Sequence, residues 1–321
     1  MDLLNSETIP SSPSDILMKY YSNNASFRST YRRQTFPFRD TLIRYITNNP
    51  SSANVYQKMI QSCKHFFIKN PIIVVPNLLF DEGGWYTQGS RPSKDRPNER
   101  SVYFIEITSK IWITDSLNVL ESTPNCPVIT SFMPQIYQSD ATLIVIYHQM
   151  CSFNDLMVIA SKCEILFLSN VVVMNNNEKV PETEGDGFET AISLEALFIA
   201  LPNVKTFQYL LPDNYLNITT SKTAEELLKI PHFLSLEKFG ISQIPEIFDN
   251  YSFFGHIKEN KKTKIELDFS YQISDEYKTR LQTIVDEILE TKNRDYKVPR
   301  INFSGITNSS NVKIRALYRQ N

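Results

Sequence analysis

The sequence contains few of the residues on which several kinds of active site depend. Only 8 glycines and 4 histidines occur among its 321 residues. Loops that cradle phosphate groups need glycine for close approach of the backbone, so this composition argues against a nucleotide-binding loop. No two histidines have the spacing of paired metal ligands; they are His65, His148, His232 and His256. We therefore expect no catalytic residues, no metal site and no cofactor, and a binding protein in place of an enzyme.

An excess of charge and long apolar runs are also missing. The 33 basic and 35 acidic residues give a formal net charge of -2, whereas nucleic-acid binding needs a basic surplus. The longest apolar stretches, such as residues 71–80, fall well short of the roughly 20 residues that a membrane-spanning helix requires. The first residues lack the basic and then apolar segments of a signal peptide. We expect no nucleic-acid and no membrane partner, and a location in the cytoplasm or the nucleus.

The 4 cysteines, Cys63, Cys126, Cys151 and Cys163, do not follow the spacing of a metal site. Each lies among apolar neighbours, where a free thiol behaves as a small hydrophobic side chain. We therefore expect reduced, structural cysteines.

Composition divides the chain into four parts. Residues 1–33 are rich in serine, asparagine and threonine and predict a disordered arm. Residues 34–70 carry helical signals. Residues 71–101 predict a linker strand followed by a mobile loop, because glycines, prolines and charges cluster after residue 80. Residues 102–321 show a repeating pattern.

That pattern is an alternation of short β-rich runs and helical segments. The runs recur at intervals of roughly 22 to 40 residues, which spans the periods of solenoid repeats. They are residues 111–113, 143–146, 165–168, 206–209, 236–239, 265–269 and 300–303. Strands that alternate with helices favour a parallel sheet with right-handed crossovers.

Two helices of this region have clear start signals. Thr223 followed by Glu226 predicts a capping box. Ser274 predicts the N-cap of the most distinct helix, whose apolar residues fall on one face. Those residues are Tyr277, Leu281, Ile284, Val285, Ile288 and Leu289.

The parallel sheet fits two architectures, a doubly wound open sheet or an arc resembling leucine-rich repeats. A doubly wound sheet is covered on both faces, so its strands are apolar throughout. Residues 264–270 instead alternate, with Ile265, Leu267 and Phe269 separated by polar residues. One wet face favours the arc, an irregular leucine-rich-repeat-like β-α solenoid with parallel strands and outer helices. Residues 201–207 and 233–239 are similar to degenerate units of such repeats but lack the regular asparagine.

Residues 34–70 predict two short helices. Pro37 suits the first position of a helix whose apolar stripe is Leu42, Ile43 and Ile46. Residues 48–50, Asn-Asn-Pro, end that helix, and Ser52 predicts the N-cap of the next. The second helix is expected to gather its apolar residues on one face: Val55, Met59, Cys63, Phe66 and Phe67. Two such helices are too small to form a core alone, so we expect them to dock on a partner or on the rest of the chain.

This segment resembles the F-box. Phe36-Pro37 matches the family's opening Leu-Pro, and the apolar stripe matches its first helix. Residues 62–66, Ser-Cys-Lys-His-Phe, match its closing Val-Cys-Lys-Arg-Phe signature. The chain departs from the family at residues 48–54, where an acidic residue and a leucine are usual. A degenerate F-box before irregular leucine-rich-like repeats is similar to the expanded F-box-like families of nematodes.

The resemblance implies a non-catalytic substrate-recognition subunit of a Skp–cullin-type ubiquitin ligase. A Skp-type adaptor would then bind the F-box-like segment, and a protein substrate would bind the repeats. The expected adaptor-binding residues are Phe36, Pro37, Leu42, Ile43, Ile46, Val55, Met59, Cys63 and Phe66. The alternative is an interaction scaffold in which the same helices only cap the first strands of a solenoid.

Overall fold

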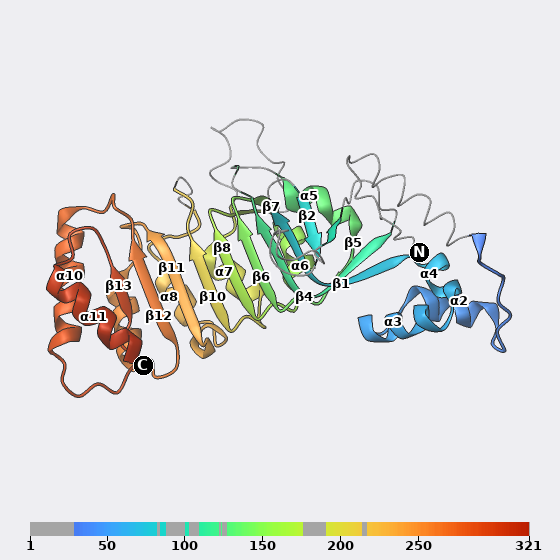
Figure 1. Ribbon diagram of the computed structural model, residues 1–321. Coiled ribbons are helices and arrows are strands. Elements are labelled where there is room, and N and C mark those ends of the chain that lie inside the picture. The colour runs from blue at the N-terminus through green and yellow to red at the C-terminus, as the bar shows by residue number, and fades with distance from the viewer. Residues whose placement is uncertain are drawn as a thin grey trace, which may run out of the picture. The chain divides into compact units, whose positions relative to one another are not determined.

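The computed structural model describes residues 29–81, 84–87, 100–102, 109–121, 123, 127–175, 191–213 and 217–320 (Figure 1). The chain divides into two compact units, Met1–Ile73 and Val74–Asn321, which we call the helical unit and the sheet unit. Most of the predicted disordered arm and of the predicted mobile loop lies outside the described residues, as does Cys126.

The described part of the helical unit contains the helices α2 (Asp40–Asn48), α3 (Ala53–Ser62) and α4 (Lys64–Lys69). The predicted stop after residue 48 is confirmed, and so is the N-cap at Ser52, whose side chain accepts a hydrogen bond from the Val55 amide. The prediction that Pro37 opens the first helix is wrong, because α2 begins three residues later at Asp40.

The second predicted helix is two helices. Cys63 has an extended backbone (φ -156°, ψ 129°), which ends α3, and its sulfur accepts a hydrogen bond from the His65 amide at the start of α4. The helical spacing predicts that Phe66 continues the face of Val55 and Met59. It does not, because Phe66 belongs to the separate helix α4. The buried residues of α3 are Ala53 and Tyr56 instead.

The sheet unit is a mixed α/β fold. Within the described residues, eleven strands form one sheet, in the order β13-β12-β11-β10-β8-β6-β4-β1-β2-β3 with β5 beside β4. From β4 to β13, neighbouring strands on this path are parallel. These strands are β4 (Lys110–Leu120), β6 (Leu143–Tyr147), β8 (Ile165–Ser169), β10 (Thr206–Leu210), β11 (Lys238–Ile244), β12 (Lys264–Phe269) and β13 (Arg300–Asn302). All seven predicted β-runs are confirmed, with β11 beginning two residues later than its run and β4 extending beyond residues 111–113.

The segment predicted as a linker belongs to this sheet. The antiparallel strands β1 (Ile72–Asp81), β2 (Gly84–Thr87) and β3 (Arg100–Val102) extend the sheet beyond β4, and β5 (Ile136–Ser139) pairs with β4 in parallel. A continuous apolar run such as residues 72–75 fits a buried strand as well as a linker, and only pairing decides between them.

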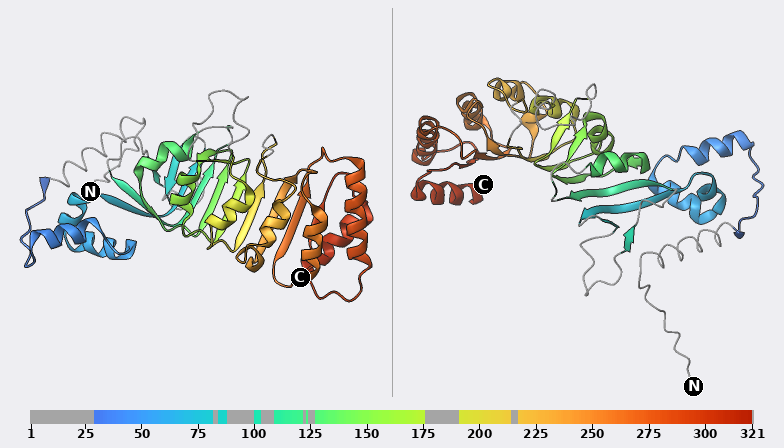
Figure 2. Two further views of the ribbon diagram at one scale, coloured as in Figure 1. Left: turned by 180° about the vertical axis from the view of Figure 1, so that it is seen from behind. Right: turned by 90° about the horizontal axis from the view of Figure 1, so that it is seen from above.

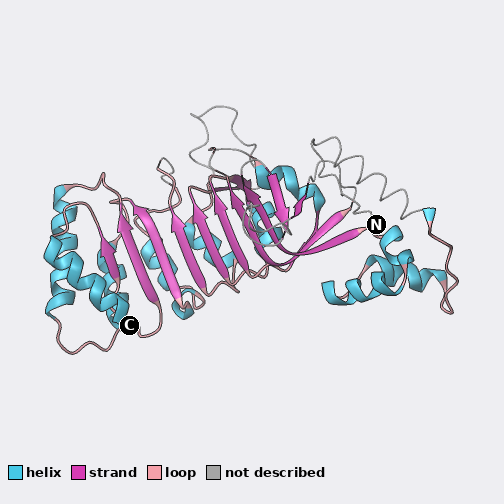
Figure 3. Ribbon diagram, in the orientation of Figure 1, coloured by secondary structure: helices cyan, strands magenta, loops and turns pink. Residues whose placement is uncertain are grey.

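Helices connect the parallel strands, since such strands cannot be joined by a tight hairpin. Figure 2 shows α6 to α10 on one face of the sheet and α11 on the other side at its C-terminal end; Figure 3 shows the same alternation by colour. The helices are α5 (Val128–Phe132), α6 (Phe153–Ala160), α7 (Leu194–Ala200), α8 (Thr223–Leu228), α9 (Asn250–Glu259), α10 (Asp275–Glu290) and α11 (Asn308–Gln320), with 3-10 turns η2 (Met133–Gln135) and η3 (Phe233–Ser235).

Of the two predicted helix starts, one is confirmed. The Ser274 side chain accepts from the Tyr277 amide, and the buried residues of α10 are those of the predicted face except Leu289, which is half-buried. The capping box at Thr223 is wrong. Thr223 is the first residue of α8, and the N-cap is Lys222. The Thr223 hydroxyl oxygen accepts a hydrogen bond from the Thr220 amide at 2.8 Å.

Backbone features recur from strand to strand. The carbonyl just before one strand accepts hydrogen bonds from two amides at the start of the next strand. The Thr142 carbonyl accepts from the amides of Glu164 and Ile165, and the Glu164 carbonyl accepts from those of Lys205 and Thr206. A left-handed residue directly follows β6 and β8, with φ of 53° at His148 and 52° at Asn170, and Gln243, with φ of 61°, lies at the register shift near the end of β11. After β6 and β8 the chain forms a second, parallel pair, β7 (Met150–Ser152) and β9 (Val172–Met174).

The core consists of two rows of side chains that point from the parallel strands toward the helices. No member of either row is more than 4% exposed. By strand pairing, the rows are Leu117, Ile144, Leu166, Phe207, Phe239 and Ile265, and then Val119, Ile146, Leu168, Tyr209, Ile241, Leu267 and Ile301. The predicted inward positions Ile265, Leu267 and Phe269 are confirmed at 3%, 4% and 4% exposure.

Two phenylalanines test this one-sided burial. Phe239 points inward among the rings of Phe198, Phe207, Phe233 and Phe253, whereas Phe167 points to the other face and is half-buried. We expect Phe239→Ala to lower the free energy of unfolding by about 3–5 kcal/mol, because it leaves a cavity. Phe167→Ala should lower it by only about 1 kcal/mol. Guanidinium denaturation followed by circular dichroism measures both, and equal losses would contradict a core on one face only.

Candidate functional site

Tyr56 holds the helical unit together. Its ring is fully buried, and its hydroxyl donates to the Asn70 carbonyl at 2.6 Å and accepts from the Ile72 amide at 3.0 Å. The Asn70 side chain in turn donates to the Thr47 carbonyl at 2.9 Å. This network ties α2, α3 and the end of α4 to one another, so a unit with little apolar volume keeps a defined arrangement.

One side of the helical unit carries exposed apolar side chains. Leu42, Tyr45 and Ile46 on α2 are 44%, 66% and 38% exposed, and Phe38 just before the helix is 59% exposed. Residues three and four apart lie on the same side of a helix, so the three α2 residues form a continuous ridge. We call these four residues the α2 ridge. Val55 on α3 is a further exposed apolar residue, at 41%.

The nine residues expected to bind an adaptor are divided among exposed, half-buried and buried positions. Ile43 is only 7% exposed and belongs to the core of the helical unit. Leu42, Ile46, Val55 and Pro37 are exposed. The half-buried members are Phe36, Met59, Cys63 and Phe66. The structure therefore divides the stripe of the first helix between a buried and an exposed side, because Ile43 is rotated by about 100° from Leu42.

Phe38, Tyr45 and Tyr56 are absent from the predicted set. Tyr45 follows Leu42 by three residues, so the helical spacing that selected Ile46 also marks Tyr45. Tyr56 follows the N-cap Ser52 by four residues, but no pattern distinguishes its buried face from that of Val55.

His65 and Phe36 connect the start of the described chain to α4. The Phe36 ring lies edge-on to the His65 ring with centroids 5.0 Å apart, and Nδ1 of His65 is 3.1 Å from the Tyr31 hydroxyl. Lys64 donates to the Thr30 hydroxyl at 2.6 Å. Burial and then the charge of Lys69 lower the pKa of His65. These contacts give His65 a packing role and no nucleophile to activate.

The sheet unit has a face that the connecting helices leave open. Strand pairing places its outward side chains in rows, of which the central one is Asn118, Val145, Phe167, Gln208, Gly240, Glu266 and Arg300. We call the outward surface of β6 to β13 the open face; α11 covers part of it beside β12 and β13 (Figure 2). The sequence predicted this alternation of buried and outward residues along one strand, residues 264–270.

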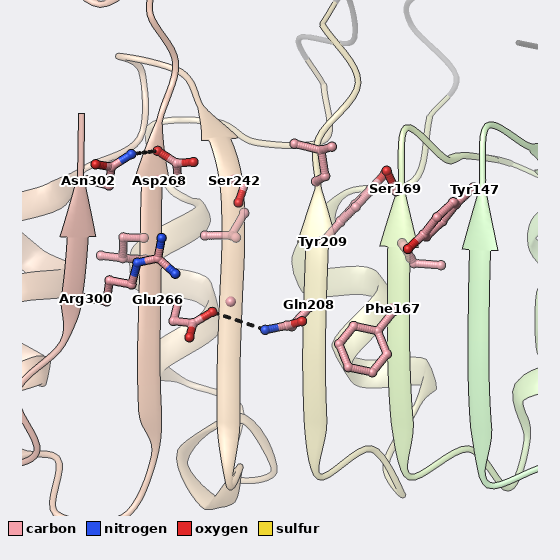
Figure 4. A pocket seen from close by; sticks show the side chains of 15 residues that line it. Tyr147, Phe167, Ser169, Gln208, Tyr209, Ser242, Glu266, Asp268, Arg300 and Asn302 are labelled. Carbon is pink, nitrogen blue, oxygen red and sulfur yellow. Dashed lines mark hydrogen bonds between the residues drawn. The ribbon is translucent and has the colours of Figure 1, made fainter. Parts of the chain in front are cut away.

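A hollow of about 300 Å³ lies in the open face (Figure 4). Gly240 contributes to its floor, since β11 has no side chain at the centre of the row. A Cβ atom at Gly240 would stand 3.2 Å from Cγ of Gln208, so a larger residue would push that side chain aside. Phe167 and Tyr147 line one side of the hollow, and polar residues of β12 and β13 line the other.

Glu266 organises the polar side of the hollow. Its carboxylate accepts from Nε2 of Gln208 at 3.2 Å and from the Tyr318 hydroxyl at 2.7 Å, and it pairs with Nζ of Lys238 at 3.2 Å. Tyr318 belongs to α11, and burial followed by its bond to Glu266 raises its pKa. The ammonium of Lys264 lies 5.4 Å from the centre of the Tyr318 ring. Glu266 therefore joins three strands and the last helix across the open face.

Metal-ligating and nucleophilic groups are scattered in the part of the chain that the structure describes. There, no three His, Cys, Asp or Glu side chains gather as metal ligands would. Cys151 and Cys163 are buried and free, and burial raises the pKa of each thiol to about 12, so neither is a thiolate at neutral pH. Reduced, structural cysteines are confirmed at these two positions.

Comparison of the chain with models of known protein families, with curated proteins and with solved structures finds no match. The F-box resemblance therefore stays a prediction. No helix among the described residues is both long and apolar enough to cross a membrane.

His256 predicts a pH dependence of stability. It is half-buried against the rings of Phe233 and Phe253, and burial lowers its pKa below 6.5, with Glu259 acting weakly in the opposite sense. The unfolded chain then binds a proton at a pH where the folded ring stays neutral, so stability is lost as the pH falls through 6.5. We expect the free energy of unfolding to fall between about pH 7.5 and 5.5, and less steeply in His256→Gln. Urea denaturation across this range measures it, and identical slopes would contradict the assignment.

Proposed function

We propose that this chain is a non-catalytic substrate-recognition subunit of a Skp–cullin-type ubiquitin ligase. The helical unit would serve as a degenerate F-box that docks on a Skp-type adaptor, and the sheet unit would bind a protein substrate. Such a protein works in the cytoplasm or the nucleus. The observation that carries the proposal is the pairing of a compact helical unit bearing an exposed apolar ridge with a separate sheet that has one open face.

The α2 ridge supports adaptor docking. Small units normally bury large apolar side chains, so four neighbouring ones that remain 38% to 66% exposed favour an interaction surface. Aromatic and aliphatic residues at the centre of an interface contribute most of the binding energy. The ridge lies in the segment that resembles the F-box, and it includes Leu42 and Ile46 from the expected set.

We also propose that the sheet unit is an irregular leucine-rich-repeat-like solenoid. Three observations support this finer description. Consecutive parallel strands follow one another in chain order, a carbonyl just before one strand accepts two amides at the start of the next, and a left-handed residue follows both β6 and β8. In a solenoid each repeat contacts its neighbours and presents an extended surface to a partner.

A protein-interaction scaffold without an adaptor is the second candidate. The burial of Ile43 favours it, because part of the apolar stripe serves the packing of the helical unit itself. In this case the helical unit has only a structural, capping role, and the open face alone binds a partner.

Co-purification with a Skp-type adaptor tests the proposal. We expect the wild-type chain to bind the adaptor and the double variant Leu42→Glu, Ile46→Glu to lose at least about tenfold in affinity, because two carboxylates would enter an apolar interface. The variant spares Ile43, whose replacement would unfold the unit.

The matched control is Val158→Glu, Ile199→Glu. These two residues are 48% and 68% exposed on helices of the sheet unit, so the control adds the same charge to apolar surface elsewhere. It should bind the adaptor like the wild type. Failure of the wild-type chain to bind any Skp-type adaptor would remove the ligase proposal and leave the scaffold.

A further inference from the structure

The chemistry of the open face changes along the sheet. On β6 and β8 its outward side chains are mainly apolar or aromatic: Leu143, Val145, Tyr147, Ile165 and Phe167. On β12 and β13 they are charged or polar: Lys264, Glu266, Asp268, Arg300 and Asn302. The hollow around Gly240 lies between these two zones. A ligand seated there meets an apolar surface on one side and charges on the other.

Three charged side chains line the hollow, and they differ in the number of their hydrogen-bond and ion-pair partners. Glu266 has the three partners described above, including the Lys238 ammonium. Asp268 accepts from Nδ2 of Asn302 at 2.8 Å. Within the described residues, the Arg300 guanidinium forms no ion pair or hydrogen bond. Figure 4 shows Arg300 extending from β13 over β12, between Glu266 and Asp268.

An unpaired guanidinium beside a hollow is suited to a carboxylate. Its planar fork of N–H donors matches the two oxygens of a carboxylate, and a charge-assisted pair is about twice as strong as a neutral hydrogen bond. Lys238 offsets the charge of Glu266, which leaves Asp268 as the group that opposes an incoming acid.

Strand spacing sets the distance between the two contacts. Phe167 on β8 and the guanidinium over β12 are three strands apart, which is about 14 Å at about 4.8 Å per strand. An extended peptide covers that distance in about four residues.

We propose that the hollow recognises an extended segment of a substrate protein in which an acidic side chain follows an aromatic one by four residues. The aromatic ring packs beside Phe167 and Tyr147, and the carboxylate pairs with Arg300. This inference rests on the proposed role of the sheet unit in substrate binding, and it names the class of segment that is bound.

Fluorescence polarisation with the full-length chain and two labelled nine-residue peptides tests this recognition. Both peptides are acetylated and amidated, with the sequences Gly-Ser-Phe-Ser-Thr-Ser-Glu-Ser-Gly and the same with Gln in place of Glu. We expect the Glu peptide to bind about tenfold more tightly, because only it forms the charge-assisted pair. Arg300→Gln should abolish the advantage of the Glu peptide, which then binds no more tightly than the Gln peptide because Asp268 still opposes its carboxylate.

In contrast to Arg300→Gln, Asp268→Asn is expected to increase the affinity for the Glu peptide. Removing the opposing charge should strengthen binding of the Glu peptide by roughly threefold to fivefold and leave the Gln peptide unchanged. A gain of affinity cannot come from misfolding. Lys222→Gln, which removes an exposed cation next to α8 and outside the open face, is the matched control and should change neither peptide.

The inference is overturned if neither peptide binds, if both bind the wild-type chain alike, or if Arg300→Gln keeps their difference. None of these outcomes bears on the adaptor, because the hollow lies in the sheet unit and the adaptor is expected to bind the helical unit. Loss of adaptor binding with retained peptide selectivity would in turn remove the ligase proposal and keep this one.

Discussion

Helices α6 to α10 cover one face of the parallel strands (Figure 2). Every second side chain of each strand is therefore buried under the helices, and the side chains between them point to the opposite face. The two inward rows are apolar across the whole series of strands from β4 to β12 and are no more than 4% exposed. A shift of register by one residue at β12 would bring an outward charge such as Lys264 or Glu266 into this core. The cost of burying that charge holds β12 in register with its neighbours, and the polar rows of the open face follow from it.

The two candidate surfaces arise from the same constraint in different ways. In the sheet unit, packing leaves the outward positions unconstrained, so they can carry Gln208, Glu266 and Arg300 without loss of core volume. Glu266 then gathers donors from neighbouring strands and α11, which keeps the polar side of the hollow ordered. In the helical unit there is too little apolar volume to bury every large side chain. Tyr56 and Ile43 occupy the centre, and Leu42 and Tyr45 stay outside.

Local patterns predicted much of the fold. Short β-rich runs located the strands, and alternating polarity in residues 264–269 indicated which side chains are buried, because period-two burial leaves a mark in the sequence. Ser274 and Ser52 were identified as N-caps, since a capping hydroxyl acts within three residues. The capping box at Thr223 failed because its hydroxyl oxygen is engaged by the Thr220 amide, in the segment just before the helix. The strand predicted at the start of residues 71–101 is present as β1, but its place in the large sheet could not be predicted, because a strand's partners are distant in sequence.

The sequence alone determined the periodicity, and therefore the α/β class, the parallel strands and the one wet face of residues 264–270. It also located the helical segment and its end at residue 48. Only the tertiary structure decided which outward residues share a row, and that Gly240 opens a hollow between Gln208 and Glu266. It also decided that Ile43 packs inward while Leu42 remains exposed. The reason is physical: propensity, capping and alternation act over a few residues, whereas the hydrogen bond from Gln208 to Glu266 joins positions 58 residues apart and exists only when the strands pair.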